Sequence, residues 1–365
     1  MKILYDGYIF SAQRNGGISR YFASLIKRLP ESWTPTVRPG KQPNLVRVNH
    51  PRLRQQHFPF NTIRPQVLSY ALARPYFKLL DSTCGFQVLH PTYHFRLPRD
   101  LVRRGRQPVV ITVYDMIPEI YQDELDPDGV ETMAKRSAIE SADAIICISE
   151  STRRDLQERY AIPDARITVT YLASDLTNEM GFGPEAIPET PYFIFLGNRG
   201  VYKNFARTLL AFSRIAKEWR ELKLCVVGDA LNGNEVELVR ALNLEGRVVQ
   251  MGFIDDAHLA KLYRCSEALC YPSLYEGFGI PPLEAMTCGT VVITSDRSSL
   301  PEVVGDAAIT VNPDSVEEIA EALLSLRSLG SRRQAFIERG LERARQFNWN
   351  ETARRTIEVY KSVAN

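Results

Sequence analysis

Residues 271–286 read YPSLYEGFGIPPLEAM, and this stretch decides how the second half of the chain folds. The apolar run Ala268–Tyr271 predicts a β-strand. A helix is predicted over Pro281–Cys288, because proline fits the first helical turn, where its missing N–H costs nothing. Gly277 and Gly279 lie between strand and helix and let a ligand approach the backbone closely. The unpaired N–H groups and the positive end of the helix dipole then predict an anion site.

Two glutamates flank this glycine turn. Glu276 lies at the carboxyl end of the strand, and Glu284 lies one to two helical turns further on, where it can accept hydrogen bonds from hydroxyls. A diphosphate between two hydroxyl-rich rings fits this arrangement. The alternative is a structural strand–turn–helix with two surface glutamates.

The same alternation of short apolar runs and amphipathic stretches continues outward in both directions. Further strands are predicted at Lys2–Tyr5, Phe86–His90, Val109–Val113, Ala144–Ile148, Ile167–Thr170, Tyr192–Leu196, Lys223–Gly228, Val248–Met251, Val291–Thr294 and Ala307–Val311. Further helices are predicted at Ile18–Leu29, Pro65–Leu80, Val130–Ser141, Ser149–Tyr160, Phe205–Trp219, Glu235–Leu242, Ala257–Cys265, Val316–Leu329 and Asn350–Val363. This alternation predicts an α/β protein with parallel sheets covered on both faces, which bind ligands at the carboxyl ends of their strands.

The length of 365 residues indicates two domains. A linker rich in glycine and proline, residues 181–191, precedes a new strand, so we expect one domain over 1–178 and a second over 179–348. The final helix, within 349–365, has no strand after it, and we expect it to pack back on the first domain.

Charge is unevenly distributed. Residues 1–110 hold 18 basic and four acidic side chains, a net charge of +14, and the remainder carries −12. This imbalance favours an anionic partner for the first half. The basic residues are scattered, with one tight cluster of Arg96, Arg99, Arg103, Arg104 and Arg106. Nucleic acid is one such partner, and an anionic membrane surface or a lipid diphosphate lying on it fits as well; we expect no nucleic acid. A solvated basic face without a partner is the alternative.

The remaining bulk features favour a cytoplasmic protein. No apolar run approaches the roughly 20 residues that span a bilayer, and the first residues resemble a strand more than a signal peptide. Six cysteines, none in a C-x-x-C pair, are expected to be buried, reduced thiols. They are Cys84, Cys147, Cys225, Cys265, Cys270 and Cys288.

The stretch 271–286 resembles the retaining glycosyltransferases of family 4, whose hallmark is two glutamates separated by seven residues, here Glu276 and Glu284. Residues 289–292 (GTVV) and 300–308 (LPEVVGDAA) are also similar to that family. The resemblance implies a hexosyltransferase with the GT-B fold: two Rossmann-like domains whose parallel sheets face a central cleft. The first domain would then bind the acceptor and the second the nucleotide sugar.

A second motif, residues 196–204 (LGNRGVYKN), follows the first strand of the second domain. In the family this turn supplies a lysine, and often an arginine, to the donor diphosphate. Lys203 matches the lysine, whereas Asn198 stands where many members have arginine. Arg199 is the candidate that replaces that charge. Two cations there would stabilise the charge that develops as the sugar leaves.

The resemblance assigns further donor-binding residues around the glycine turn and after a neighbouring strand. They are Phe253, Ser273, Gly277, Phe278, Gly279 and Ile280. Nothing in these side chains selects guanine or uracil.

The N-terminal stretches 5–10 (YDGYIF) and 15–22 (NGGISRYF) resemble the family's mannosyltransferase-like branch. Gly16 and Gly17 open a helix and are expected to meet the donor from the first domain. Arg20 is a candidate acceptor contact or an ordinary helix arginine.

Two strand ends of the first domain supply the remaining candidates. Asp115 is the candidate contact for the transferred sugar, because Tyr114 stands where many members have a histidine. His90 is a candidate catalytic residue or a strand-end histidine satisfied by backbone. Tyr93 and Tyr114 are candidate acceptor contacts.

No metal is expected. Asp126-Pro127-Asp128 matches an Asp-x-Asp pair, but it precedes a predicted helix and is better explained as a helix cap. Lys203 and the helix dipole already neutralise a diphosphate.

The resemblance implies a retaining transfer, with GDP-mannose as the expected donor and UDP-glucose or another hexose nucleotide as the alternative. The acceptor is expected to be a glycan on a lipid diphosphate at the inner membrane face, in surface polysaccharide biosynthesis. Two other classes remain open, a sugar-nucleotide epimerase of the same architecture and a non-catalytic nucleotide-sugar binding protein. A nicotinamide dehydrogenase is disfavoured, since no G-x-G-x-x-G follows the first strand.

Overall fold

The computed structural model describes residues 1–12, 16–38, 48–56, 66–83, 85–96, 100–102 and 107–364. The chain forms two compact units. Unit 1 comprises Met1–Leu172 and Trp349–Asn365, and unit 2 comprises Ala173–Asn348. The first division follows residue 172, within the boundary region predicted near Ala173–Pro191 and ahead of the predicted domain limit at 178.

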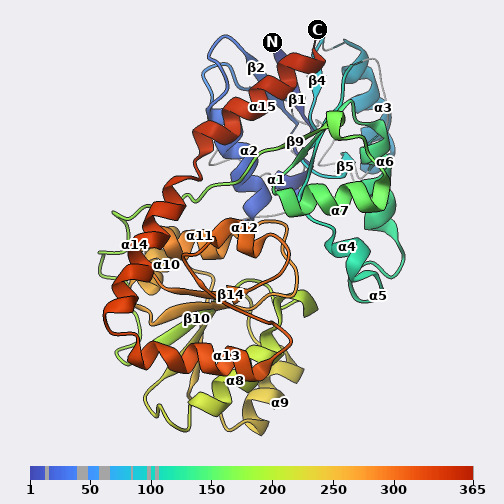
Figure 1. Cartoon of the computed structure of the whole chain (residues 1–365). Helices are drawn as coiled ribbons and strands as arrows, with labels where there is room; N and C mark the ends of the chain where they lie inside the picture. Colours follow the sequence, from blue (N-terminus) through green and yellow to red (C-terminus); the bar gives the residue numbers. More distant parts are fainter. Residues whose placement is uncertain are drawn as a thin grey trace. The chain divides into compact units, whose positions relative to one another are not determined.

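A six-stranded parallel sheet forms the centre of unit 2 (Figure 1). Its strands are β10 (Tyr192–Leu196), β11 (Lys223–Val227), β12 (Val248–Gly252), β13 (Ala268–Tyr271), β14 (Val292–Ser295) and β15 (Ile309–Val311). They lie in the order β12-β11-β10-β13-β14-β15. The order reverses direction between β10 and β13, and such a switch point is where open α/β sheets bind ligands.

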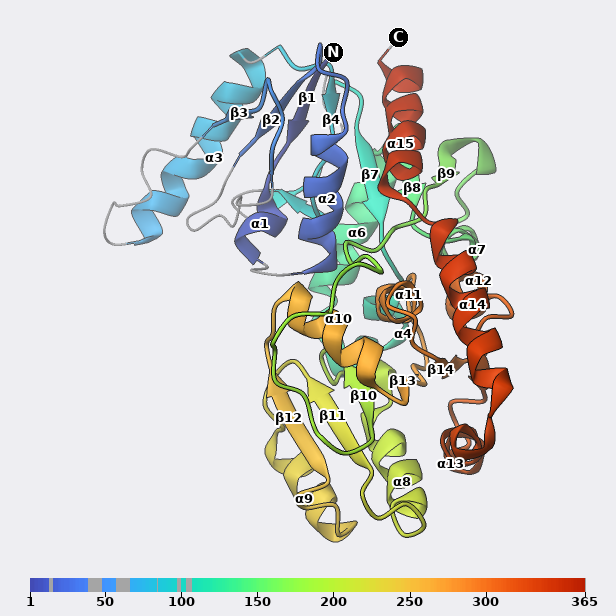
Figure 2. The same cartoon turned by 90° about the vertical axis from the view of Figure 1, so that its left-hand side faces the viewer.

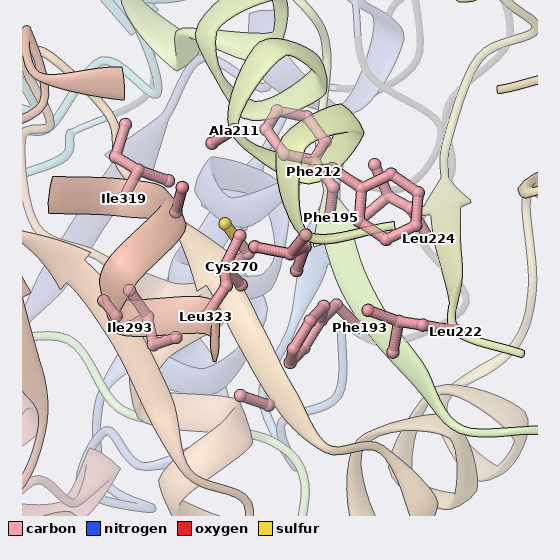
Figure 3. Packing of buried hydrophobic residues seen from close by; sticks show 14 of the residues in the cluster. Phe193, Phe195, Ala211, Phe212, Leu222, Leu224, Cys270, Ile293, Ile319 and Leu323 are labelled. Atoms are coloured by element: carbon pink, nitrogen blue, oxygen red, sulfur yellow. The ribbon is translucent and has the colours of Figure 1, made fainter. Parts of the chain in front are cut away.

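Helices pack on this sheet and bury its apolar side chains. They are α8 (Phe205–Ile215), α9 (Gly233–Ala241), α10 (Asp256–Cys265), α11 (Ile280–Thr287), α12 (Leu300–Val304), α13 (Val316–Ser325) and α14 (Ser331–Arg345). On one face Phe193 and Phe195 of β10 pack with Phe212 of α8 and Leu323 of α13 (Figure 3). Alternate residues of a strand point to one face, which is why residues 193 and 195 share this core.

Unit 1 contains two parallel sheets joined by one bridge between Leu89 and Val109. The first has the order β3-β2-β1-β4 and the second the order β7-β8-β9. The bounds are β1 (Lys2–Tyr5), β2 (Thr34–Val37), β3 (Arg54–Gln55), β4 (Val88–Leu89), β7 (Val110–Val113), β8 (Ala144–Cys147) and β9 (Ile167–Val169), with a separate antiparallel pair, β5 (Phe95–Arg96) and β6 (Asp100–Leu101). The strand order of the first sheet reverses between β1 and β4, which gives unit 1 a switch point of its own.

The helices of unit 1 include the last one of the chain. They are α1 (Tyr8–Ala12), α2 (Gly17–Lys27), α3 (Gln66–Thr83), α4 (Ile117–Ile120), α5 (Gln122–Leu125), α6 (Val130–Ser141), α7 (Glu150–Tyr160) and α15 (Trp349–Val363). Helix α15 lies against α2 and β8 (Figure 2). Tyr360 in α15 reaches the hydroxyl of Tyr5 in β1 at 3.1 Å, so the two ends of the chain share one core.

The predicted strands Tyr192–Leu196 and Ala268–Tyr271 and the predicted helix Val130–Ser141 are confirmed residue for residue. Helix α14 was not predicted. Its buried residues are the small Gly340 and Ala344, so it lacks a wide apolar stripe, and Gly340 instead allows close approach to Met286 of α11.

The described cysteines are free thiols, as expected. Burial is confirmed for Cys147, Cys225, Cys270 and Cys288, but Cys265, the last residue of α10, is exposed. Cys84, and four arginines of the predicted basic cluster (Arg99, Arg103, Arg104 and Arg106), lie outside the described residues. Among the described helices, none combines the length and the apolar character needed to cross a membrane.

Candidate active site

The glycine turn of residues 271–286 lies at the switch point of unit 2. Strand β13 ends at Tyr271, and α11 begins at Ile280. Lys203 ends a short 3₁₀ turn that follows β10. Because β10 and β13 are adjacent parallel strands, their carboxyl ends bring the two loops together.

Lys203 and Glu276 form an ion pair, with 2.7 Å between Nζ and Oε1. Lys203 Nζ also donates to the Tyr271 hydroxyl. The side chains of Lys203 and Glu276 are 11% and 10% exposed, so each charge depends on the other for compensation. Burial, and then the charge of Glu276, raise the pKa of Tyr271 well above its ordinary value, so that this hydroxyl keeps its proton. The sequence analysis had not singled out Tyr271, although its place at the strand end beside the motif was visible.

Asn204 fixes the loop that carries Lys203. It adopts a left-handed backbone conformation (φ 61°) and its side-chain amide donates to the carbonyls of Pro272, at 3.0 Å, and Pro313, at 2.6 Å. Asn204 Oδ1 accepts from Arg207 at 3.0 Å. One buried amide therefore holds the loops after β10, β13 and β15 together.

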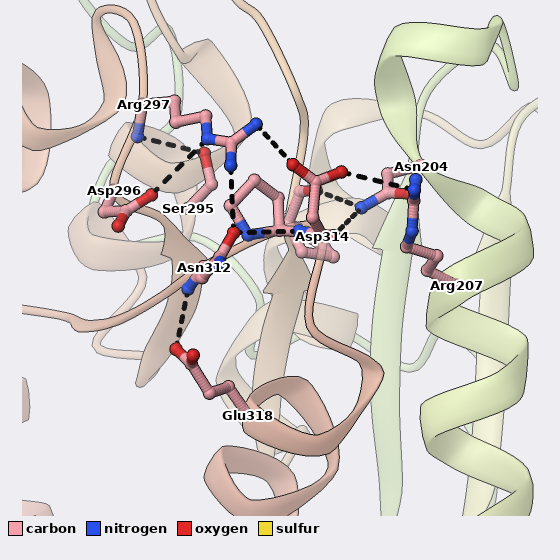
Figure 4. A network of polar contacts seen from close by, with 10 residues as sticks. Asn204, Arg207, Ser295, Asp296, Arg297, Asn312, Asp314 and Glu318 are labelled. Carbon is pink, nitrogen blue, oxygen red and sulfur yellow. Dashed lines mark hydrogen bonds and ion pairs between the residues drawn. The ribbon is translucent and has the colours of Figure 1, made fainter.

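A polar network extends from Asn204 (Figure 4). Asp314 pairs with Arg207 at 3.2 Å and with Arg297 at 2.7 Å. Arg297 also donates to Asn312 Oδ1 at 2.9 Å. The network connects the start of α8 with the loops after β14 and β15, and so stiffens the edge of the sheet on which Lys203 lies.

Hydrogen bonds from two serines hold the glycine turn in place. Ser299 Oγ donates to the carbonyls of Glu276 and Phe278 at 2.8 and 2.7 Å. Ser298 Oγ accepts from the amide of Glu276 at 2.9 Å. Gly279 has a φ of 116°, a conformation that favours glycine.

The prolines of α11 limit which amides an anion can meet. Pro281 and Pro282 have no N–H, so donors at this helix start come from residues 277–280. Glu284, on the same helix, is 5% exposed. The helix dipole still places positive potential at this end.

Arg199 does not replace the missing arginine, which corrects the sequence-based expectation. Its Nε donates to Glu235 at 2.8 Å, and a second nitrogen donates to the carbonyl of Ala230. Arg199 is thus committed to the loop after β11 and the start of α9. Asn198 accepts from the Tyr202 hydroxyl at 3.1 Å. Within the fully described stretch 197–204, Lys203 is therefore the cation that meets Glu276.

Phe253 and Ser273 occupy opposite environments. Phe253 follows β12 and is 79% exposed, whereas Ser273, after β13, is buried and its Oγ has no hydrogen-bond partner among the described residues. Phe253 follows the third strand from β13, about 14 Å away at the usual strand spacing. An exposed aromatic ring at that distance from β13 along the carboxyl edge of the sheet can pack against a flat group attached to a diphosphate.

His90 is enclosed in unit 1, which corrects its predicted catalytic place. It is 0% exposed, with Nδ1 2.6 Å from the Tyr360 hydroxyl and Nε2 2.9 Å from Thr112 Oγ1. Burial lowers its pKa to about 3, so it is neutral. The ring therefore connects β4, β7 and α15 and does not face a ligand. Its hydrogen-bond partners are side-chain hydroxyls, whereas the alternative prediction was a histidine satisfied by backbone groups.

Asp115 follows β7 and keeps a partly exposed carboxylate, 29% of its side chain. Its Oδ1 accepts from the amide of Ile117 at 3.0 Å. Lys135, fully buried, donates to the Asp115 carbonyl at 2.9 Å and to Glu119 at 2.6 Å. A buried cation therefore fixes the loop of Asp115, and this candidate keeps its place at the carboxyl edge of the sheet.

The other candidates of unit 1 differ in exposure. Tyr114 is buried, and its hydroxyl donates to the Thr92 carbonyl at 3.3 Å. It is therefore a structural residue of unit 1 and not the predicted acceptor contact. Tyr93 and Arg20 are half-buried. Gly16 and Gly17 begin α2, where the Gly16 amide donates to Ser19 Oγ at 3.2 Å. Asn15 lies outside the described residues.

The Asp-x-Asp stretch caps a helix, as predicted. The carboxylate of Asp126 accepts from the amides of Glu131 and Thr132 at 2.9 and 2.8 Å, at the start of α6. These hydrogen bonds lower the pKa of Asp126 in spite of its desolvation. Within the described ranges, no group of three or more histidine, cysteine or acidic side chains is placed to hold a metal ion.

Comparison with known proteins identifies the family. Residues 15–178 match the model described as Glycosyltransferase Family 4, and residues 180–343 match the model described as Glycosyl transferases group 1. The O-antigen chain mannosyltransferase B of Escherichia coli is 31% identical over 302 residues, which cover 76% of this chain and 79% of that protein. The chain is a family 4 glycosyltransferase.

Similarity to solved structures identifies the fold class of the glycosyltransferase. Sucrose-phosphate synthase from Thermosynechococcus elongatus has a TM-score of 0.77 at 21% identity, over 99% of this chain and 98% of that one. HepE of Anabaena, in complex with UDP and glucose, has a TM-score of 0.76 at 16% identity, over 99% of both chains. The predicted GT-B fold and the predicted class of enzyme, a hexosyltransferase, are confirmed.

Proposed function

We propose that this glycosyltransferase moves mannose from GDP-mannose to a glycan carried on a lipid diphosphate, in surface polysaccharide biosynthesis, with retention of anomeric configuration. The name of the Escherichia coli relative supports mannose and a polysaccharide acceptor. Retention is proposed from the pair Glu276 and Glu284, whose spacing is that of the retaining enzymes.

The observation that carries the proposal is the meeting of Lys203 and Glu276 beside the glycine turn, at the switch point of unit 2. In the proposed complex Lys203 and the amides of residues 277–280 bind the diphosphate. Glu276 then holds hydroxyls of the transferred sugar and Glu284 holds the ribose. Phe253 packs against the base.

We further propose a same-face displacement. The bond between the sugar C1 and the diphosphate oxygen breaks, and a bond between C1 and the acceptor oxygen forms on the same face. The acceptor proton passes to the leaving diphosphate oxygen, so no protein nucleophile is needed. Lys203 and the helix dipole stabilise the negative charge that develops on that oxygen. Because these groups neutralise the diphosphate, we propose that transfer needs no metal.

Nucleotide release from a panel of GDP- and UDP-sugars, with and without lipid-linked acceptors, tests the proposal. GDP release from GDP-mannose should require acceptor, survive EDTA and retain the anomer in the product. Faster release from UDP-glucose would replace the donor with the alternative that the UDP and glucose complex of HepE favours. Conversion of a donor to its epimer without acceptor would instead identify an epimerase, and binding without release a non-catalytic protein.

The place of action is part of the same proposal. An acceptor on a lipid diphosphate requires the enzyme to work at a membrane surface, for which we propose the cytoplasmic face. The net charge of +14 over residues 1–110 favours binding to anionic lipid. Sedimentation with vesicles containing 30% phosphatidylglycerol should fall with salt. Equal sedimentation with neutral vesicles would contradict a charge-based attachment.

A further inference from the structure

The switch point of unit 1 carries a pair of tyrosines that the reaction proposed above does not use. Tyr8 follows β1 as the first part of α1, and Tyr93 follows β4. Strands β1 and β4 are adjacent and parallel, and the strand order reverses between them. Ligands of open α/β sheets bind outside the carboxyl ends at such a point.

The two rings stack on each other in nearly parallel planes. Their centroids are 5.8 Å apart and their planes differ by 10°. Phe95, which is 3% exposed, lies 5.9 Å from the ring of Tyr8 and 6.4 Å from that of Tyr93. Both tyrosines are half-buried, so they keep accessible surface while Phe95 restricts their motion. Rigid tyrosine rings offer apolar contact area at a low entropic cost.

Carboxylates lie beside this stacked pair of tyrosines. Tyr93 hydrogen-bonds to Glu131, the second residue of α6, and interacts electrostatically with Asp115. The Asp115 loop is held by Lys135, as described above. Carboxylates accept hydrogen bonds and cannot donate them when ionised, so they suit a ligand rich in hydroxyls.

Among the residues of this region that the structure describes, the charges disfavour an anionic ligand. Lys135 is paired with Glu119, and Arg96 interacts with the buried Asp6. Both of these cations are therefore matched by a carboxylate of their own. A phosphate placed beside Asp115 and Glu131 would meet like charge.

We infer that Tyr8, Tyr93, Asp115 and Glu131 form a subsite for one uncharged hexose ring, the sugar of the acceptor that receives the new bond. One face of the hexose packs on the outer face of the stacked tyrosine pair, and its hydroxyls donate to the two carboxylates. The assignment to the acceptor rests on the proposed function, in which Glu276 and Glu284 of unit 2 hold the rings of the donor. It moves Asp115 from the transferred sugar, its predicted ligand, to the sugar of the acceptor. Any phosphate of the acceptor lies away from this subsite.

Binding is tested without nucleotide, so that its outcome does not depend on transfer. Saturation-transfer NMR on the full chain with methyl α-D-mannopyranoside should show binding, and Tyr8→Ala and Tyr93→Ala should each weaken it at least fivefold. Tyr93→Phe keeps the ring and should lose less. Phe182→Ala removes an aromatic ring of unit 2 that is 71% exposed and should change nothing. No binding by the unaltered protein, or tighter binding of mannose 6-phosphate, would overturn the subsite.

Kinetics then distinguish the two possible sources of the ring. Tyr8→Ala should raise the KM for acceptor at least fivefold and leave the KM for donor unchanged. Tyr93→Phe, a milder change, guards against loss of folding as the cause. A rise in the KM for donor alone would assign the ring to the donor and overturn the inference. If no donor supports transfer but the mannoside still binds through Tyr8, the proposed function fails and the subsite stands.

Discussion

At the scale of single residues, Lys203 and Glu276 are held where neither can escape into water. The amide and carbonyl of Glu276 are bound by Ser298 and Ser299, and Lys203 precedes the clamped Asn204. A buried ion pair adds little net stability, but removing one partner strands the other charge. The pair is therefore both a binding element and a point at which the fold is sensitive.

Lys203→Met should destabilise unit 2 by about 3 kcal/mol, the lower end of the range for a broken buried pair, since Glu276 then lacks its cation. The double variant Lys203→Met/Glu276→Gln should recover part of this loss, because no unpaired charge remains. Calorimetric unfolding midpoints of the two single variants and the double variant measure the coupling. Strictly additive losses would show that the two charges do not depend on each other.

Glu276→Gln is expected to lower kcat by about 10²–10³-fold, because a neutral amide stabilises the transition state less than a carboxylate does. Nucleotide affinity should not fall, since Glu276 is proposed to hold the sugar and Lys203, released from its partner, still binds the diphosphate. Steady-state kinetics and calorimetric titration with GDP separate the two effects. Glu302→Gln, a change of another glutamate of unit 2, serves as the control, and full activity of Glu276→Gln would remove the assignment.

At the scale of elements, the start of α11 depends on one glycine. Gly279 has a φ of 116°, and a Cβ there would lie 2.9 Å from Leu300 Cδ2. Two serines anchor the preceding turn, so the backbone has little room to adjust. The amides of residues 277–280 are therefore oriented by steric constraint.

Gly279→Ala should destabilise unit 2 by about 1–2 kcal/mol through backbone strain and should weaken GDP binding at least tenfold as the amides turn. Gly233→Ala is the matched control, since a Cβ at that helical position meets nothing within 4 Å. Thermal unfolding and calorimetric titration of both variants give the comparison. Unchanged GDP binding by Gly279→Ala would argue that the diphosphate lies elsewhere.

Elements were predicted better than side-chain directions, and the reason is physical. Strands such as Tyr192–Leu196 are apolar runs bounded by turn residues, a local signal, and the motif around Glu276 is likewise contiguous. The partners of Arg199 and His90 are 36 and 270 residues away along the chain, so local patterns carry no information on them. The predicted cation at Arg199 failed for this reason, as did the predicted catalytic place of His90.

At the scale of the whole molecule, His90 marks where distant parts of the chain meet. One ring nitrogen contacts Thr112, which is 22 residues away along the chain, and the other contacts Tyr360, which is 270 residues away. Around it lie Tyr5, Phe22 and Tyr360, with ring centroids between 5.0 and 5.9 Å from its own. The core of unit 1 is thus assembled from both ends of the chain.

The stability of unit 1 should decline as the pH falls below 6.5. The pKa of His90 is about 3 in the folded protein and about 6.5 when unfolded, so the unfolded chain binds the extra proton between these values. The contribution of His90 to the free energy of unfolding is complete above pH 6.5. Below pH 6.5 this contribution decreases by up to about 1.4 kcal/mol per pH unit. Burial also lowers the pKa of His94, in the same direction.

Thermal unfolding between pH 7.5 and 5 checks this expectation. The His90→Gln variant should be less stable than the unaltered protein at pH 7.5. Its unfolding temperature should, however, fall less than that of the unaltered protein as the pH is lowered. Most carboxylates stay ionised over this range, which isolates the histidines. Parallel slopes for the two proteins would show that His90 does not set the pH dependence.

Helix α15 also has a consequence for biosynthesis. A ribosome makes residues 173–348 before it reaches Tyr360, so unit 2 is the first part of the nascent chain whose core can be completed. Unit 1, although translated before unit 2, must wait for residues Trp349–Asn365 before Tyr5 and His90 receive their partner. A stop codon just before Trp349 would therefore leave unit 2 intact and damage unit 1, although unit 1 is translated before it.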